Sequence, residues 1–554
     1  MSSNRQPGWW KEAVVYQVYP RSFQDSNNDG IGDLPGILSR LDYIQSLGVD
    51  AIWLNPFFKS PNDDGGYDIC DYLSIQPEFG TMADFDRLLE GAHQRGLKII
   101  IDLVFNHTSD EHQWFRASSQ SRTNPKRPYY FWRDGKGDGP PSNWPSFFGG
   151  SAWQKDDRTG QYYLHLFSKK QPDLNWENPQ VREELQSIIR YWTNKGVDGI
   201  RLDVISAISK RTDFPDADTA DFNEIIARYY ANGPRIFEFI GELRAQALSD
   251  ASVLTVGEGP GINAENAVDY LSEGKGLDMI FHFDHMFLDQ GPGGRFDPKP
   301  WSMEDFKLVF SRWDEALYQR SKGWGSIFLG NHDFPRQVSR WGNDGEFREE
   351  AAKAILTLLM TLRGTPFIYA GDELGMTNIK LKSVSQSKDV ETLNGFRTAQ
   401  EKGISEEEFL LAANYAGRDN ARTPFQWDDS TYAGFSGVEP WMVVNPNKAV
   451  INRESQEKEP SSVLNHFRKL IRLRKSEKTL VYGDYLPVET SDGQLMAYKR
   501  VGEGVEWMVL INFSDKNMNA LPDLTGYELV ISNVVGSKAN GMLPWEAKIL
   551  KKAV

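Results

Sequence analysis

Eight short apolar runs recur along the first two thirds of the chain, with amphipathic segments between them. Each run is rich in Val, Ile, Leu or aromatic residues and has little polar alternation, which is typical of strands buried on both faces of a parallel sheet. The runs are VVYQVYP (14–20), DAIWLNP (50–56), KIIIDLVFN (98–106), GIRLDV (199–204), VLTVGEG (253–259), MIFHFD (279–284), SIFLGNHD (326–333) and TPFIYAG (365–371). Eight such strands alternating with helices predict an α/β fold, a (β/α)₈ TIM barrel.

Segments between these runs have helical periodicity. Three of them are LPGILSRLDYIQSLG (34–48), MADFDRLLEGAHQRG (82–96) and VREELQSIIRYWTNKG (181–196). The last two end in Gly96 and Gly196, where a left-handed residue is expected to close a helix.

Two connections are too long for ordinary loops. The first is rich in Gly, Pro, Ser and Trp and follows the third strand, so a small inserted domain is expected there. The chain after the helix VLNHFRKLIRLRKSE (463–477) alternates between apolar and polar residues, which predicts antiparallel strands. The predicted domains are a barrel (1–106 and 177–479, with an insertion at about 372–458), an inserted domain (107–176) and a carboxy-terminal β-sandwich (480–554).

Composition and charge narrow the classes of partner. The formal charge of −15 argues against nucleic acid, since phosphates would not be neutralised. The start MSSNRQPGWWKEAVVYQ has no basic stretch followed by an apolar run, and no apolar stretch approaches the roughly 20 residues of a membrane span. The single cysteine, Cys70, is typical of a reducing compartment. We therefore expect a cytoplasmic protein without a membrane partner.

Three acidic residues stand at the ends of apolar runs: Asp203, Glu258 and Asp333. Chemistry in such a barrel takes place at the carboxyl ends of the strands. Ordinary ion pairs with Arg201 and Arg336 are the structural alternative, but three acids converging on one rim favour a function. Two carboxyl groups facing a glycosidic bond are typical of glycoside hydrolysis, and a third one nearby raises the pKa of the acid.

The same strand ends carry a family resemblance. DAIWLNP, DLVFNH, GIRLDV, VGEG and NHD resemble the strand-end motifs of the α-amylase family, glycoside hydrolase family 13. QPDLNWENP (171–179) resembles the signature of its oligo-1,6-glucosidase subgroup, and GYDICDY (66–72) and GRDNARTPFQWD (417–428) point the same way. The resemblance covers nearly the whole chain, in order.

The resemblance implies a retaining mechanism. It makes Asp203 the nucleophile that forms a β-glucosyl-enzyme, and Glu258 the acid/base that protonates the leaving oxygen and then deprotonates water. Asp333 is expected to bind sugar hydroxyls and to stabilise the oxocarbenium-like transition state. The two principal carboxyl groups of retaining enzymes lie about 5–5.5 Å apart.

It also implies which residues surround the terminal glucose. Tyr67 is expected to stack on this sugar. Residues expected to hydrogen-bond it or to orient the carboxylates are His107, Arg201 and His332. Asp68 and Arg418 resemble the pair that closes the pocket, so that one glucose is released at a time. Phe167 and Gln171 are expected to line the sites that flank the cleaved bond.

The stretch DSNNDGIGDL (25–34) resembles a calcium loop. It is not an EF-hand, because a strand precedes it and the position of the bidentate Glu falls on Gly36. It is similar to the single calcium loop of this glucosidase subgroup, which implies a structural Ca²⁺ held by Asp25, Asn27, Asp29 and Asp33 through side chains and by Ile31 through its carbonyl. A solvated turn is the alternative. No organic cofactor is expected.

The expected substrate is a small oligosaccharide or disaccharide. In this subgroup a valine after the nucleophile accompanies α-1,6 specificity, and Val204 stands there, so an oligo-1,6-glucosidase is favoured. An α-1,4-preferring maltase and a transglucosylase or sucrose-active enzyme remain alternatives. Sucrose isomerases carry an RLDRD-type stretch where this chain has HMFLDQGPGG (285–294). Gly259, where the subgroup has methionine, is expected to enlarge the region near the leaving group.

A non-catalytic alternative is the binding ectodomain of amino-acid transporter heavy chains, which has the same barrel. Those chains carry a membrane helix and have lost catalytic acids, whereas this chain keeps all three acids. We expect a monomer or a weak homo-oligomer.

Overall fold

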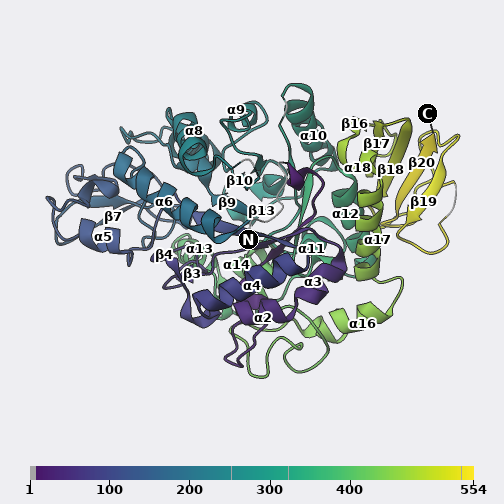
Figure 1. Cartoon of the computed structure of the whole chain (residues 1–554), viewed down its shortest axis with the longest axis horizontal. Coiled ribbons are helices and arrows are strands. Elements are labelled where there is room, and N and C mark those ends of the chain that lie inside the picture. Colours follow the sequence, from purple (N-terminus) through teal and green to yellow (C-terminus); the bar gives the residue numbers. More distant parts are fainter. Residues whose placement is uncertain (1–7, 251, 322, 538–539, 554) are drawn as a thin grey trace.

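A computed structural model describes residues 8–250, 252–321, 323–537 and 540–553 of the chain. The first seven residues, which carry part of the expectation about a secretory signal, lie outside the described residues. The barrel is in the middle of the molecule, the inserted domain at one end and the carboxy-terminal sheet at the other (Figure 1). Of the helices described, none has both the length and the apolar character to span a bilayer.

The central sheet has eight parallel strands in the order β11-β10-β9-β5-β2-β1-β15-β14. They are β1 (Val15–Val18), β2 (Ala51–Leu54), β5 (Lys98–Val104), β9 (Gly199–Asp203), β10 (Leu254–Glu258), β11 (Met279–Phe281), β14 (Ser326–Ile327) and β15 (Thr365–Tyr369). The two edge strands meet where Ser326 Oγ of β14 donates to the Ile280 carbonyl of β11, 2.7 Å away. All eight predicted strands and the barrel are confirmed.

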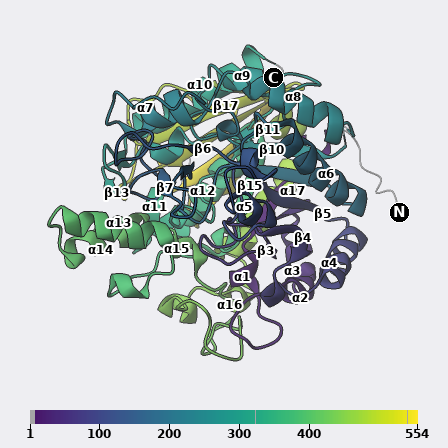
Figure 2. The same cartoon turned by 90° about the vertical axis from the view of Figure 1, so that its left-hand side faces the viewer.

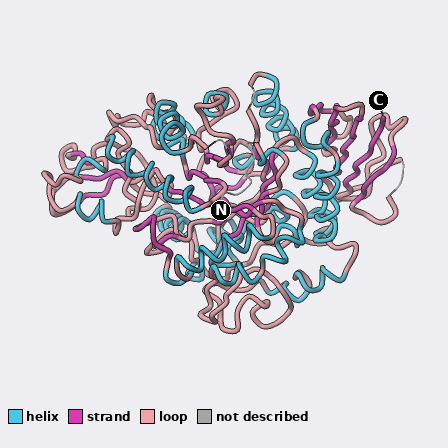
Figure 3. The backbone as a smooth tube through the Cα atoms, in the orientation of Figure 1, coloured by secondary structure: helices cyan, strands magenta, loops and turns pink. Residues whose placement is uncertain are grey.

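These strands are buried along nearly their whole length. Helices surround the strands of the barrel (Figure 3). This burial on both faces explains the absence of polar alternation in the sequence.

The helices begin and end as their termini indicate. α4 (Met82–Gln94) starts with a capping box between Thr81 and Asp84, and α6 (Pro179–Lys195) starts at the Asn178 cap. Gly96 and Gly196 have φ of 73° and 111°, as predicted. The segment 34–48 forms two helices, α2 (Leu34–Ser39) and α3 (Leu41–Leu47), because Arg40 leaves the helical conformation.

The other helices cover the barrel or lie in its loops. They are α1 (Pro20–Phe23), α5 (Gln113–Ser118), α7 (Phe222–Ile225), α8 (Ile236–Ala247), α9 (Ala267–Tyr270), α10 (Met303–Asp314), α11 (Gln337–Trp341), α12 (Arg348–Thr361), α13 (Val390–Glu401), α14 (Glu406–Ala416), α15 (Asp419–Arg422), α16 (Arg453–Lys458), α17 (Val463–Ser476) and α18 (Lys478–Tyr482).

The inserted domain has a small antiparallel sheet of β6 (Trp132–Arg133), β8 (Tyr162–Leu164) and β7 (Trp153–Lys155). Its aromatic core includes Trp144 and Trp153 and extends to Phe214 and Tyr230, which follow β9. The inserted domain is therefore packed onto the loop that follows Asp203. A further short pair, β3 (Phe58–Lys59) and β4 (Asp71–Ile75), precedes it in the chain.

The second insertion contributes a helical hairpin, α13–α14, which projects from the side of the barrel (Figure 2). Beside it lies a β-hairpin formed by β12 (Gln290–Gly291) and β13 (Gly294–Pro298). Phe296 of β13 packs into the apolar core of the helical hairpin, against Phe409.

The carboxy-terminal region is an antiparallel sheet of β16 (Asp484–Pro487), β17 (Leu495–Gly502), β18 (Val505–Asn512), β20 (Ala547–Ala553) and β19 (Glu528–Ser532). Both faces of this sheet are covered: Met496 and Tyr498 face the barrel core, while Leu495 and Ala497 pack under Met518 and Met542, whose backbones pair with each other. The expected β-sandwich stays a prediction.

Candidate active site

Asp203 and Glu258 are the last residues of the neighbouring strands β9 and β10. Arg201, two residues before Asp203, is buried between them. Its Nη1 lies 2.6 Å from Oδ1 of Asp203 and 2.7 Å from Oδ1 of Asp102, and its Nη2 lies 2.8 Å from Oε2 of Glu258. The ion pair expected of Arg201 therefore exists, and one guanidinium holds three carboxylates at the end of the barrel.

The two principal carboxyl groups differ in their surroundings. Burial raises the pKa of Asp203 well above its ordinary value, and the negative charge of Glu258 adds to this effect, although Arg201 opposes it. Arg201 and the backbone N–H of Val204, 3.1 Å away, both donate to Oε2 of Glu258. Both donors therefore meet the same carboxylate oxygen of Glu258.

Val204 has an unusual backbone. Its φ of 34° and ψ of 44° are left-handed, a conformation that a β-branched residue rarely adopts. Such strain costs about 1–3 kcal/mol and persists only where neighbours enforce it. Here it turns the chain sharply after Asp203 and directs the Val204 N–H to Glu258, while the Val204 side chain lines the pocket.

Asp333 lies in the loop after β14 and has a different set of partners. His332 Nε2 is 3.0 Å from its Oδ2, and Arg422 Nη2 and Arg418 Nη1 are 2.8 and 3.4 Å from its Oδ1. Burial raises the pKa of Asp333, but His332 and the two guanidinium groups outweigh it and hold the pKa well below its ordinary value. Asp333 is thus kept ionised. Arg336 does not pair with it and instead donates to the Ala370 carbonyl.

The pair that closes the inner end of the pocket is Arg418 with Asp64, not with Asp68. Arg418 Nη2 lies 2.9 Å from Asp64 and 2.6 Å from Asp389. Asp68 is fully buried and accepts hydrogen bonds from Ser60 Oγ and from the N–H groups of residues 63 and 64. Burial raises the pKa of Asp68 to about 7. The predicted role of Asp68 is therefore wrong: it supports the loop that carries Asp64.

The other predicted binding residues come together. The Tyr67 hydroxyl donates to Asp102 Oδ2 at 2.8 Å, and its ring stacks on His332 with centroids 5.1 Å apart. Gln171 Nε2 lies 3.1 Å from His107 Nε2 and donates to Asp64 Oδ2 at 3.0 Å. Their contacts with sugar stay predictions.

Phe167 lies at the edge of the same site. Its ring stacks on Phe147 with centroids 4.6 Å apart, and it also contacts the His107 ring. Phe167 therefore belongs to an aromatic wall contributed by the inserted domain.

The expectation that Gly259 leaves space near the leaving group is wrong. A Cβ added at Gly259 would lie 2.5 Å from Cδ1 of Ile262, which is itself buried. The volume of the absent side chain is filled by Ile262.

Several functional residues were missed from the sequence. An acid within the apolar run KIIIDLVFN was a signal for Asp102, and the motif that supplied Arg418 also contains Arg422. Asp64 stands four residues before Asp68, and nothing in the sequence distinguishes the two acids. Asp389 has no local signal, since it is brought to Arg418 only by the fold of the second insertion.

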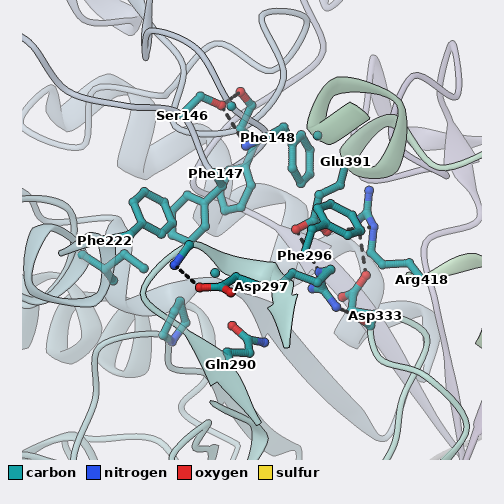
Figure 4. Close-up of a pocket in the computed structure, with 18 of the residues that line it drawn as sticks. Ser146, Phe147, Phe148, Phe222, Gln290, Phe296, Asp297, Asp333, Glu391 and Arg418 are labelled. Carbon is teal, nitrogen blue, oxygen red and sulfur yellow. Dashed lines mark hydrogen bonds and ion pairs between the residues drawn. The ribbon is translucent and has the colours of Figure 1, made fainter. Parts of the chain in front are cut away.

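The three catalytic acids and five of the predicted binding residues line one pocket of about 610 Å³; the five are Tyr67, His107, Phe167, Val204 and Arg418. At its inner end are Asp64, Asp203, Glu258, Asp333 and Arg418. Farther out, the wall consists of Phe147 and Phe222 on one side and Phe296 and Asp297 on the other (Figure 4).

The predicted calcium loop is far from this chemistry in the chain and is held by hydrogen bonds. The Asp25 carboxylate accepts from the N–H groups of Asn27, Asn28 and Gly30, and Asp33 caps α2. Burial raises the pKa of Asp33, and the nearby charge of Asp25 contributes. In the described part of the chain no three His, Cys, Asp or Glu side chains converge as a metal site.

A (β/α)₈ barrel that places an Asp and a Glu carboxyl group at the ends of adjacent strands, with a third, ionised Asp beside them, is typical of a glycoside hydrolase. The chain belongs to the α-amylase family, glycoside hydrolase family 13: residues 17–483 match the family model for the alpha amylase catalytic domain.

The chain is similar in sequence to named relatives and in structure to solved enzymes. It is 49% identical to an oligo-1,6-glucosidase of Parageobacillus thermoglucosidasius, over 98% of this chain and 99% of that one. It is 43% identical to a glucan 1,6-alpha-glucosidase of Streptococcus dysgalactiae subsp. equisimilis, over 99% and 100%. The isomaltulose synthase of Klebsiella sp. LX3 superposes with a TM-score of 0.95 at 43% identity, over 98% of this chain and 99% of that chain.

Proposed function

We propose that this protein is a retaining, exo-acting α-glucosidase that releases glucose from the non-reducing ends of short α-glucosides, with α-1,6 bonds preferred. The observation that carries the proposal is the inner end of the pocket. Asp203 and Glu258 share Arg201 there, and the Asp64–Arg418 pair closes the space behind them. A closed inner end accepts a terminal sugar and excludes the middle of a chain.

The chemistry has two steps. In the first, the carboxylate of Asp203 attacks the anomeric carbon, the glycosidic bond breaks, and the proton of the Glu258 carboxyl group moves to the leaving oxygen. In the second, water attacks the β-glucosyl ester, Glu258 takes a proton from this water, and Asp203 leaves as a carboxylate. Two inversions give α-glucose. Asp333, kept ionised, holds sugar hydroxyls and stabilises the positive charge that develops at the ring.

The proposed bond preference rests on Val204 and on the similarity to an oligo-1,6-glucosidase and to a glucan 1,6-alpha-glucosidase. The test compares kcat/KM for isomaltose, panose, maltose and sucrose, with products identified. We expect isomaltose and panose to be cleaved well ahead of maltose. Faster cleavage of maltose would refute the α-1,6 preference and leave the mechanism intact.

A second candidate is sucrose isomerisation, because the similar solved structures include isomaltulose synthases. With sucrose as the substrate, an isomerase returns isomaltulose, whereas a hydrolase returns equal amounts of glucose and fructose. We expect the second outcome. Isomaltulose as the main product would reverse this assignment.

We also propose a structural Ca²⁺ in the loop 25–33, a cytoplasmic location and a monomer or weak homo-oligomer. Oxygen-only donors suit Ca²⁺. A cation would offset both the burial and the charge of Asp25, which raise the pKa of Asp33. The loop is joined to the second insertion, since Ser436 Oγ donates to Asp25 and the Gly437 N–H to Asn28. Bound Ca²⁺ would stabilise this junction.

A further inference from the structure

One face of α13 forms a continuous wall of the pocket. Its pocket-lining residues are Glu391, Gly395, Thr398, Ala399 and Lys402, the last at the C-cap. Spacings of three and four place these residues on one side of the helix. At about 1.5 Å per residue, this stripe extends roughly 16 Å from Glu391 to Lys402.

The inner end of this stripe is fixed to the catalytic residues. Glu391 lies 3.5 Å from Arg418, whose partners include Asp333. Arg295 of β13 lies 2.9 Å from Glu391 and donates to the backbone carbonyl of Asp333 at 2.8 Å. The β-hairpin, α13 and the catalytic loop are therefore one connected wall, and its other end lies away from the cleaved bond.

Phe296 is the apolar surface of this wall. Its ring packs on Phe409 with centroids 4.9 Å apart and lies directly on Gly395. A Cβ at Gly395 would come within 2.7 Å of the Phe296 ring, so glycine is what allows the ring to lie against the helix. In Figure 4 this ring is in the middle of the pocket, across from Phe147 and Phe222.

The polar groups of the outer wall suit a neutral sugar. Asp297 and Lys402 are largely exposed, and the Thr398 side chain lines the pocket beside them. Aromatic faces with scattered hydroxyl, amine and carboxylate groups match the apolar faces and hydroxyl rims of pyranose rings. A stripe of this length extends past the ring on the far side of the cleaved bond.

We propose that α13 and the β12–β13 hairpin form a distal subsite for the third sugar of the substrate, with Phe296 as its specificity-determining residue. This inference rests on the proposed function and names its substrate class: gluco-oligosaccharides of three or more units. Disaccharides reach the catalytic residues but not this subsite.

The experiment measures kcat/KM on isomaltose and isomaltotriose, and on maltose and maltotriose, for the wild type and Phe296→Ala. We expect the trisaccharide-to-disaccharide ratio to fall at least fivefold, with the disaccharide rate changed less than twofold. Phe296→Tyr, which keeps the ring, is expected to retain the ratio. Leu411→Ala, at an exposed position on α14, is the control for effects on the helical hairpin.

Lys402→Met, at an exposed position, keeps the proposal testable if Phe296→Ala folds poorly, and it is expected to lower the same ratio. Ratios unchanged in both variants, or an equal loss on both substrate lengths, would overturn the distal subsite. Preference for maltose over isomaltose would refute the α-1,6 proposal alone, because the length ratio is read separately for each linkage.

Discussion

The inner and outer ends of the pocket are built in opposite ways. At the inner end every named carboxylate faces a buried guanidinium, as Asp203 and Glu258 face Arg201, and Asp64 faces Arg418. At the outer end, Phe296 and Phe147 form aromatic faces, and the charged groups are exposed. A fixed, fully paired inner end recognises one sugar and carries out the reaction. The outer end selects which oligosaccharides reach the inner end.

Removing the nucleophile is the strongest test of the inner end. Asp203→Ala, folded as judged by thermal unfolding, should lose activity by a factor on the order of 10⁴ or more. With α-glucosyl fluoride and azide, this variant should give β-glucosyl azide, whereas Glu258→Ala should give the α-anomer, since its glucosyl-enzyme still forms. The same product from both variants would contradict the assigned roles.

Removing the Asp64–Arg418 ion pair should lower both the enzymatic activity and the stability of the fold. Arg418→Met leaves Asp64 and Asp389 buried without their cation, and loss of one partner from a buried pair costs about 3–5 kcal/mol. The free energy of unfolding, measured with urea, should fall by this amount. The Asp64→Asn/Arg418→Met double variant should lose less than the sum of the single variants. An additive loss would show that the two residues do not act as a pair.

Changing Val204 should affect the bond preference and leave the reaction intact. Val204→Ala removes the branched side chain beside the leaving sugar, and pocket changes of this size are worth about 1–3 kcal/mol. We expect the isomaltose-to-maltose ratio in kcat/KM to fall about tenfold. The rate on an aryl α-glucoside is the internal control, and a ratio unchanged within twofold would assign the preference to other residues.

The pH profile should separate the roles of Asp203 and Glu258. Burial raises the pKa of Asp203, and the nucleophile must be ionised, so Asp203 sets the acid limb of kcat/KM. Glu258 must be protonated to act as the acid, so its ionisation sets the alkaline limb. On an aryl glucoside with a good leaving group, Glu258→Gln should keep the acid limb and lose the alkaline limb. An alkaline limb that stays in this variant would show that another group sets it.

The smallest effect is expected far from the pocket. If the loop 25–33 binds Ca²⁺ at about a hundred times its Kd, chelation removes about 2.7 kcal/mol of stability. We expect the Tm to fall by several degrees with EGTA and to recover with added Ca²⁺, while kcat at 25 °C is unchanged. Asp29→Asn, at an exposed ligand position, should abolish this response.

Periodicity was enough to predict the barrel, because strands buried on both faces have an unmistakable pattern. It was not enough to predict the pocket closure. Asp64 and Asp68 are equivalent in sequence, and the turn through Gly65 and Gly66, with φ of 57° and 102°, determines which one faces Arg418. The β12–β13 hairpin has too much glycine and proline for any strand pattern. Asp389 approaches the site only through tertiary folding.

The left-handed backbone of Val204 limits which residues can stand there. Glycine would relieve the strain, but it would also remove a buried side chain and give the unfolded chain more freedom, so heat resistance alone would not favour Val204→Gly. The same exchange would delete a side chain that lines the pocket and loosen the turn that directs an N–H to Glu258. Stability of the fold and the geometry beside the acid/base therefore favour the same side chain at this position.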